Sequence, residues 1–309
     1  MRVFFAFLSL VLLWSLTPLA IKWSGEGPGY LMGVMSRMGL GLVGVLLILL
    51  IKGTPIPLDR RAVLTYLAGS VQIYGCMFLT YWASQHIPSG WISVIYGLTP
   101  LLTAPPAAFY LGEDSLTAPR LLSYVAGVAG LVCLFHSALA FSPEALWGVL
   151  AVVAGSFLQA LSSVWVKRIQ RGLPAFTLVA GILLIAVPFY VLSWWSLDGR
   201  IPDPIPMRAL ASIVFLGLVA TVFGFALYFY ILKNLAAGQV ALVTLLTPVL
   251  SLYVGHGINQ EPLQESTLIG TAFVILALML YESRLLMGLL ARLLASAVRL
   301  AKEVGRVQR

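Results

Sequence analysis

The chain has 309 residues, of which 60% are hydrophobic and only 10% charged, and it carries a formal net charge of +8. Soluble globular domains are about half apolar and about one quarter charged. The composition therefore excludes an ordinary soluble enzyme, a disordered chain and a disulfide scaffold. Nearly all charged residues lie in short segments between long apolar runs, which is typical of a membrane protein with several spans.

Ten apolar segments follow one another along the chain, and each is long enough for a helix that crosses a bilayer. Glycine, proline and charged residues separate them, as at residues 53–61 and 198–206. We therefore predict an all-α fold, a polytopic membrane protein with ten transmembrane helices. The predicted spans are 3–23, 30–51, 62–83, 89–111, 118–136, 145–166, 174–196, 208–232, 239–259 and 266–285.

The basic residues are distributed unequally between the two ends of these spans. If the N-terminus is cytoplasmic, 15 of the 19 Lys and Arg residues lie on the cytoplasmic side, whereas Lys22, Arg200 and Arg208 lie on the outer side. Cytoplasmic loops of membrane proteins carry such an excess. We predict a multi-pass protein of the cell inner membrane with both termini in the cytoplasm. Because the positive charge is explained by topology, no nucleic-acid partner is expected.

Two stretches of the chain, 78–113 and 226–261, align at a constant offset. Each half then holds five spans, and because five is odd the second half is inverted relative to the first. Inverted repeats are typical of secondary transporters. We predict a five-plus-five inverted repeat with halves at 1–141 and 142–285. The matched positions are Gly90 with Gly238, Thr99-Pro100 with Thr247-Pro248, Glu113 with Glu261 and, more weakly, Lys22 with Lys167.

Arg37 is the cation that lies inside a span, roughly 10–12 Å from the outer interface at 1.5 Å per residue. An ionisable group at that depth is costly and is a candidate functional residue. One interpretation is that Arg37 binds a substrate carboxylate through charge-assisted hydrogen bonds. The other is a structural arginine that reaches the interface or bonds helix carbonyls. Most of the acidic residues fall in predicted outer loops: Glu26, Glu144, Asp198, Asp203, Glu261 and Glu265.

Polar and aromatic side chains near the middle of several spans form a second set of candidates. A Gln or Tyr in hydrocarbon needs hydrogen-bond partners, and aromatic walls with a few polar groups suit an amphipathic solute. Each Thr has a structural alternative, because its hydroxyl can bond its own helix backbone. The predicted substrate-binding residues are Trp14, Arg37, Gln72, Tyr74, Tyr96, Thr99, Gln159 and Thr247.

Pro100 and Pro248 fall in mid-span at positions related by the repeat. A proline inside a helix frees a carbonyl and bends the helix. In a transporter this can be a hinge or a place where backbone meets substrate. The alternative is a static kink that neighbouring helices support.

No pattern in the sequence indicates an enzyme: we find no phosphate-binding glycine loop, no nucleophile paired with a base and no cluster of metal ligands. We expect no catalytic activity, no cofactor and no metal. Cys76 and Cys133 lie inside spans and are interpreted as small apolar packing residues. Several glycines are expected to allow close helix packing, namely Gly41, Gly44, Gly127 and Gly130.

The segment 286–309 has apolar residues at helical spacing, with Arg292, Arg299 and Arg306 on another face. This pattern predicts a basic amphipathic helix on the anionic cytoplasmic leaflet. The alternative is a coiled-coil seam between two copies of the chain. The sequence leaves a monomer and a homodimer open.

Several short motifs occur in a fixed order along the chain: Trp14-Ser15, Lys22, Arg37, Leu98-Thr99-Pro100, Leu111-Gly112-Glu113 and Leu246-Thr247-Pro248. Their order resembles the EamA-type members of the drug/metabolite transporter superfamily over about residues 3–285. The second half reads Ile258-Asn259-Gln260-Glu261 where the family has Leu-Gly-Glu, so only the Glu matches. The resemblance implies a five-plus-five carrier that exports small metabolites such as amino acids, with helices 1, 3, 4, 6, 8 and 9 around a central cavity.

We therefore predict a secondary transporter that exports small amphipathic metabolites by alternating access. The alternatives are a channel-like facilitator, a multidrug exporter, a membrane scaffold without transport and a membrane-embedded enzyme of lipid chemistry. A proton-coupled exporter of cationic drugs is disfavoured because no Asp or Glu lies at the centre of a predicted span. An enzyme of lipid chemistry is disfavoured because no catalytic groups cluster at one interface.

Overall fold

The computed structural model describes residues 2–112, 118–169, 172–201, 204–224, 227, 231 and 237–281. Within these ranges every regular element is a helix. Seven of these helices are long and apolar enough to cross a bilayer, and two shorter apolar helices lie at Met207–Phe223 and Glu265–Tyr281. Nearly all described residues of the ten predicted spans are helical, which confirms the predicted class of an all-helical, multi-span membrane protein. Glu113 and the amphipathic segment 286–309 lie outside the described residues.

The first five predicted spans contain two interruptions. The third span is α-helical at both ends and π-helical in its middle, and the fourth is divided at Gly97 and Leu98. The elements are α1 (Arg2–Ser24), α2 (Gly29–Lys52), α3 (Arg60–Ser70), η1 (Val71–Cys76), α4 (Met77–Ala83), α5 (Ser89–Tyr96), α6 (Thr99–Leu111) and α7 (Ala118–Phe141).

The remaining elements repeat this pattern in part. The described portion of the eighth predicted span again passes from α-helix into π-helix. The elements are α8 (Pro143–Ile169), α9 (Ala175–Leu197), α10 (Met207–Val214), η2 (Phe215–Phe223), α12 (Ala237–Asn259) and α13 (Glu265–Tyr281).

Local sequence explains where several of these helices begin and end. Gly53 ends α2 in the left-handed conformation at φ 60°, which glycine adopts without steric cost. Asp59 begins α3, because its carboxylate accepts hydrogen bonds from the backbone N–H groups of Arg61 and Ala62. The α2–α3 connection therefore has a defined stop and a defined start.

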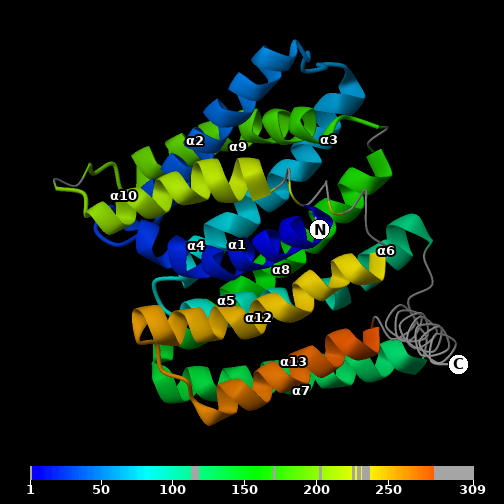
Figure 1. The fold of residues 1–309 in the computed structure, drawn as a ribbon, viewed down its shortest axis with the longest axis vertical. Coiled ribbons are helices and arrows are strands. Elements are labelled where there is room, and N and C mark those ends of the chain that lie inside the picture. Colours follow the sequence, from blue (N-terminus) through cyan, green and yellow to red (C-terminus); the bar gives the residue numbers. More distant parts are fainter. Residues whose placement is uncertain are drawn as a thin grey trace, which may run out of the picture.

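The helices run side by side as one bundle, and Figure 1 shows three groups across it. At one edge α7 packs on α13, at the other α2 packs on α9 and η2, and between them α1 and α5 pack on α12. The helix α8 contacts α3, η1, α4 and α6. One end of the bundle carries the connections at residues 25–28, 84–88 and 260–264; we name it the Lys22 end, after the last basic residue of α1.

Glycines allow two of the helix crossings to be close, as the sequence predicts. A Cβ at Gly130 on α7 would lie 3.0 Å from the carbonyl oxygen of Gly270 on α13. A Cβ at Gly217 on η2 would lie 3.0 Å from the carbonyl oxygen of Arg37, beside Gly41 on α2. Helices in lipid associate mainly through such van der Waals contact, because lipid is as apolar as the helix surfaces.

Candidate functional site

Arg37 lies on α2, about 12 Å along the helix from its first residue Gly29. The side chain is 8% exposed, and Nη1 donates a hydrogen bond to the Tyr81 hydroxyl at 3.4 Å. The Nε atom is buried and has no hydrogen-bond partner among the described residues. The one hydrogen bond of this guanidinium is long and goes to a neutral hydroxyl. It offsets little of the free energy that the buried charge loses when it leaves water.

A cluster of polar side chains surrounds the hydroxyl of Tyr96, which lies at the end of α5. The Tyr96 oxygen lies 2.5 Å from Thr80 Oγ1 and 3.0 Å from Cys76 Sγ. Cys76 Sγ also lies 3.8 Å from Gln159 Oε1 on α8. The interpretation of Cys76 as an apolar packing residue was therefore wrong, since its thiol takes part in a hydrogen-bonded cluster.

Arg37 belongs to the same region of the bundle as this cluster. Arg37 bonds the hydroxyl of Tyr81 on α4, and the preceding residue of that helix, Thr80, bonds the hydroxyl of Tyr96. We name the set Arg37, Cys76, Tyr96 and Gln159 the central cluster. It contains one cation, a phenol, a thiol and an amide, which are groups that can bind the carboxylate and the polar end of a small solute.

The π-helical segment η1 supplies part of this geometry. A π-helix bonds i to i+5 and leaves wide turns, and such turns are frequent at functional sites. The Tyr190 hydroxyl of α9 donates to the carbonyl oxygens of Ile73 and Tyr74 in η1, at 2.6 and 3.1 Å. Cys76 is the last residue of η1 and faces α8, where a Cβ at Gly155 would lie 3.2 Å from the Cys76 carbonyl oxygen.

Three further predicted substrate-binding residues, Tyr74, Gln72 and Trp14, have different surroundings. The hydroxyl of Tyr74 lies 2.7 Å from Ser193 Oγ on α9, so it points away from Tyr96. Gln72 is half-buried in η1, and Trp14 of α1 is half-buried beside Leu13. Their roles in binding stay predictions.

The two predicted threonines lie on different helices. Thr99 begins α6, and its Oγ1 has no hydrogen-bond partner among the described residues. Thr247 is 9% exposed in the middle of α12. An unpartnered buried hydroxyl such as that of Thr99 is open to a ligand or a water molecule, because it otherwise bears an uncompensated desolvation cost.

The two repeat-related prolines have different settings. Pro100 lies in the middle of the fourth span, as predicted, and the helix is interrupted just before it at Gly97 and Leu98, so that Pro100 falls in the first turn of α6. Proline is favoured there, since the first turn needs no N–H from it. Pro248 lies inside the continuous helix α12, as predicted. Whether either proline is a hinge stays a prediction.

A second polar network lies at the Lys22 end of the bundle and centres on Glu261. Lys22 Nζ lies 3.3 Å from Glu261 Oε1 and also donates to the carbonyl oxygen of Ile87 at 3.3 Å. Glu261 Oε2 accepts from the backbone N–H and the hydroxyl of Ser89, at 2.8 and 2.9 Å, at the start of α5. Asn259 donates to Oε1 at 3.0 Å.

Sequence reasoning missed this network because it assigned Glu261 to an outer loop. Glu261 does follow the end of α12, but it is only 7% exposed. The neighbouring bonds extend the network: Trp23 Nε1 donates to Asn259 Oδ1 at 2.9 Å, and His256 Nδ1 lies 2.8 Å from the Glu261 carbonyl oxygen. The repeat did single out Lys22 and Glu261, each of which matches a residue of the same type in the other half.

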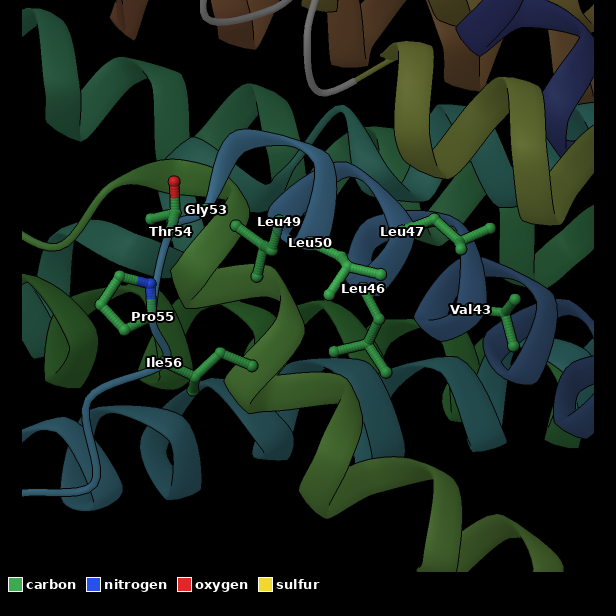
Figure 2. Close-up of a pocket in the computed structure, with 9 residues that line it drawn as sticks. All are labelled: Val43, Leu46, Leu47, Leu49, Leu50, Gly53, Thr54, Pro55 and Ile56. Atoms are coloured by element: carbon green, nitrogen blue, oxygen red, sulfur yellow. The ribbon is translucent and has the colours of Figure 1, made fainter.

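An open hollow of about 520 Å³ lies at the opposite end of the bundle. Figure 2 shows its lining, which comes from the last turns of α2 and the connection that follows. The residues that line it are almost all aliphatic, such as Leu46, Leu50 and Ile56, and Leu50 is largely exposed. Arg37 does not line the hollow, and Thr54 is its one residue with a polar side chain, which is too little to select a solute. We therefore place the candidate site at the central cluster.

Comparisons with known proteins agree with this architecture. The profile of the EamA-like transporter family matches residues 1–136 and again residues 146–282. A solved crystal structure, 22% identical in sequence, superimposes with a TM-score of 0.61 and covers 91% of this chain and 97% of its own. The likeness to that structure supports the fold.

Curated relatives are similarly distant in sequence. The uncharacterized transporter YoaV of Bacillus subtilis is 22% identical over 88% of this chain and 94% of its own length. A probable terminal-alkyne amino-acid exporter of Streptantibioticus cattleyicolor is 24% identical over the same shares. A probable amino-acid metabolite efflux pump of Escherichia coli is 24% identical over 62% of this chain and 67% of its own length.

The helical bundle and the two family matches define the class of the protein as a multi-pass membrane transporter. The chain belongs to the EamA-like transporter family.

Proposed function

We propose that the protein is a secondary carrier that exports small amphipathic metabolites bearing a carboxylate, such as amino acids, by alternating access. The observation that carries the proposal is Arg37: a buried cation whose Nε has no partner among the described residues, close to a cluster of hydrogen-bonding groups. A substrate carboxylate would supply the missing acceptor and the opposite charge.

The rest of the central cluster suits the remainder of such a solute. Tyr96 and Gln159 offer a hydroxyl and an amide, while Tyr81 and Tyr190 add aromatic surface. Ligand sites combine apolar walls with a few placed polar groups in this way. The relatives named as amino-acid exporters in other organisms support the same class of substrate.

The proposed topology follows from the distribution of charge and from the repeat. The Lys22 end faces the outside of the inner membrane, both termini are cytoplasmic, and residues 142–285 are an inverted copy of residues 1–141. The two family matches, which divide the chain between residues 136 and 146, support this division. An inverted pair of similar halves can adopt two conformations of similar energy, one open to each side.

The test is counterflow in proteoliposomes with a panel of labelled amino acids. A carrier accumulates label against excess unlabelled substrate and saturates, whereas a channel only equilibrates the label. We expect Arg37→Gln to reduce counterflow by about tenfold or more, the cost of one charged hydrogen bond, while Arg200→Gln in the exposed outer connection leaves it unchanged. Counterflow without saturation for every solute, or an unchanged rate in Arg37→Gln, contradicts the proposal.

A further inference from the structure

The network around Glu261 joins parts of the chain that are far apart in sequence. Lys22 comes from α1 and Ser89 from α5, both in the first predicted half, whereas Glu261 follows α12 in the second. We propose that the Lys22–Glu261 ion pair is the outer gate of the carrier, which closes the path from outside to the central cluster. This rests on the proposed function, because only an alternating-access carrier needs such a gate.

The described helices are in close contact beside the ion pair. A Cβ at Gly90 on α5 would lie 2.9 Å from the Cα of Leu252 on α12, and a Cβ at Gly255 would lie 3.0 Å from Ser89 Oγ. On α1, the backbone carbonyl of Ser15 accepts a hydrogen bond from the Ser251 hydroxyl at 3.0 Å. The helices α1 and α5 must therefore move away from α12 before anything can pass at this end.

Glu261 is buried and Lys22 is partly exposed, and this difference suits an ion pair that forms and dissociates as the helices move. Glu261 is almost fully buried and accepts four bonds, but the Lys22 side chain is 25% exposed. Water can therefore replace the pair when the helices separate, so opening does not strand a charge in hydrocarbon. By contrast, the Arg208–Glu26 pair at the same end is more exposed, at 54% and 34%, and joins α10 to the α1–α2 connection, away from α5 and α12.

The helix α5 connects the gate to the central cluster. Ser89 is its first residue and Tyr96 its last, which separates them by about 10 Å along the helix. A turn at Gly97 and Leu98, immediately after Tyr96, separates α5 from α6. In the proposed opening, α5 tilts about this turn. A solute that hydrogen-bonds Tyr96 therefore contacts one end of α5, and the other end of α5 is bonded to Glu261 through Ser89.

Cys76 provides a reporter for this gate, because it lies in the central cluster and is fully buried. The experiment uses intact cells or spheroplasts that express a Cys133→Ala background, without added substrate. A small anionic, membrane-impermeant methanethiosulfonate reagent is added from outside, and the rate of Cys76 modification is measured. We expect Lys22→Gln and Glu261→Gln each to raise this rate by about tenfold or more, as the closed state loses a charge-assisted contact.

Two matched controls carry substitutions of the same type at the same end. Glu265→Gln removes an exposed carboxylate at the start of α13, and Arg208→Gln removes an exposed cation, so both should leave the Cys76 rate unchanged. If the ion pair had only a structural role, Glu261→Gln would unfold at a lower temperature, but its Cys76 would be modified no faster. An unchanged Cys76 rate in both gate variants overturns the proposal, and so does an equal rise in the controls.

A second arm joins the two positions covalently instead of neutralising them. In a Cys133→Ala background that retains the buried Cys76, Lys22→Cys and Glu261→Cys are combined and joined with a bifunctional thiol reagent that is cleaved by reductant. We expect counterflow to stop on cross-linking and to return on reduction, and we expect the reagent to cause no change in a protein that carries only one of the two introduced cysteines. Counterflow that persists in fully cross-linked protein contradicts the gate. The labelling of Cys76 needs no substrate. If the proposed substrate class is wrong, the counterflow test fails, but the labelling test of the gate is unaffected.

Discussion

Lys22 and Arg37 are both basic side chains within the membrane-spanning helices, but their surroundings differ. Lys22 lies near the end of α1, 25% exposed, and is paired with a carboxylate. Arg37 lies deeper, 8% exposed, and among the described residues it bonds only the neutral Tyr81 hydroxyl. A paired cation joins helices within the protein, whereas an unpaired buried cation retains the capacity to bind an incoming anion. This difference is consistent with the proposed roles, a gate at Lys22 and a substrate-binding residue at Arg37.

The largest effect on stability is expected where the paired charge loses its partner. Glu261→Ala leaves Lys22 and the N–H of Ser89 without their acceptor, so we expect a loss of about 2–3 kcal/mol, the lower range for a buried pair because Lys22 is partly exposed. Thermal unfolding of the purified protein in detergent measures the loss. Glu265→Gln, at an exposed position, serves as the control. If Glu261→Ala lost no more stability than this control, the Glu261 network would contribute no more than an ordinary surface contact.

The opposite sign is expected at the unpaired charge. Arg37→Met replaces an uncompensated guanidinium with an apolar side chain of similar length, so we expect stability to be unchanged or higher by about 1 kcal/mol in the absence of substrate. Transport should nevertheless be lost, since the substrate's partner is gone. A variant that unfolds at a much lower temperature would mean that Arg37 is structural, bonded more fully than its single Tyr81 contact indicates.

The apolar segments and the charge distribution were sufficient to predict the helices, because lipid requires every spanning segment to satisfy its own backbone. Arg37 was also identified from sequence, as a cation out of place in a span. The π-helical segment η1 was not predicted, because only packing determines where the hydrogen-bonding pattern changes there. The interruption at Gly97 and Leu98 does have a cause in the sequence, since Pro100 has no N–H to donate to the carbonyl oxygen of Tyr96.

Contacts between distant segments were the other part that sequence did not provide. Glu261 lies at the edge of hydrocarbon, where hydropathy cannot distinguish an exposed loop from a buried turn. The sequence alone indicates an apolar role for Cys76, because the partners of its thiol, Tyr96 and Gln159, come from other helices. Tyr74 and Tyr96 are equally good candidates by composition, yet one hydroxyl faces Ser193 and the other the central cluster.

A smaller effect is expected within the central cluster. Tyr96→Phe removes a hydroxyl that lies near Thr80 and Cys76 but keeps the ring, so the predicted loss of stability is about 1 kcal/mol, the value of one neutral hydrogen bond. If the hydroxyl also contacts substrate, the concentration for half-maximal counterflow should rise severalfold with the maximal rate little changed. Tyr74→Phe, which removes a hydroxyl bonded to Ser193, provides the comparison. Equal kinetics in the two variants would argue that neither hydroxyl touches substrate.

The smallest effect is expected at the exposed ion pair of the Lys22 end. Arg208 bonds Glu26 where water and salt screen both side chains, and such pairs contribute roughly 0–1 kcal/mol. Arg208→Gln should therefore lower stability by less than about 1 kcal/mol at low ionic strength, and the difference should vanish at high salt. The loss in Glu261→Ala should persist at high salt, because ions reach a buried carboxylate poorly. Measuring both variants across a salt series sharpens the comparison, because we expect burial, rather than the presence of an ion pair, to decide which contacts stabilise the Lys22 end.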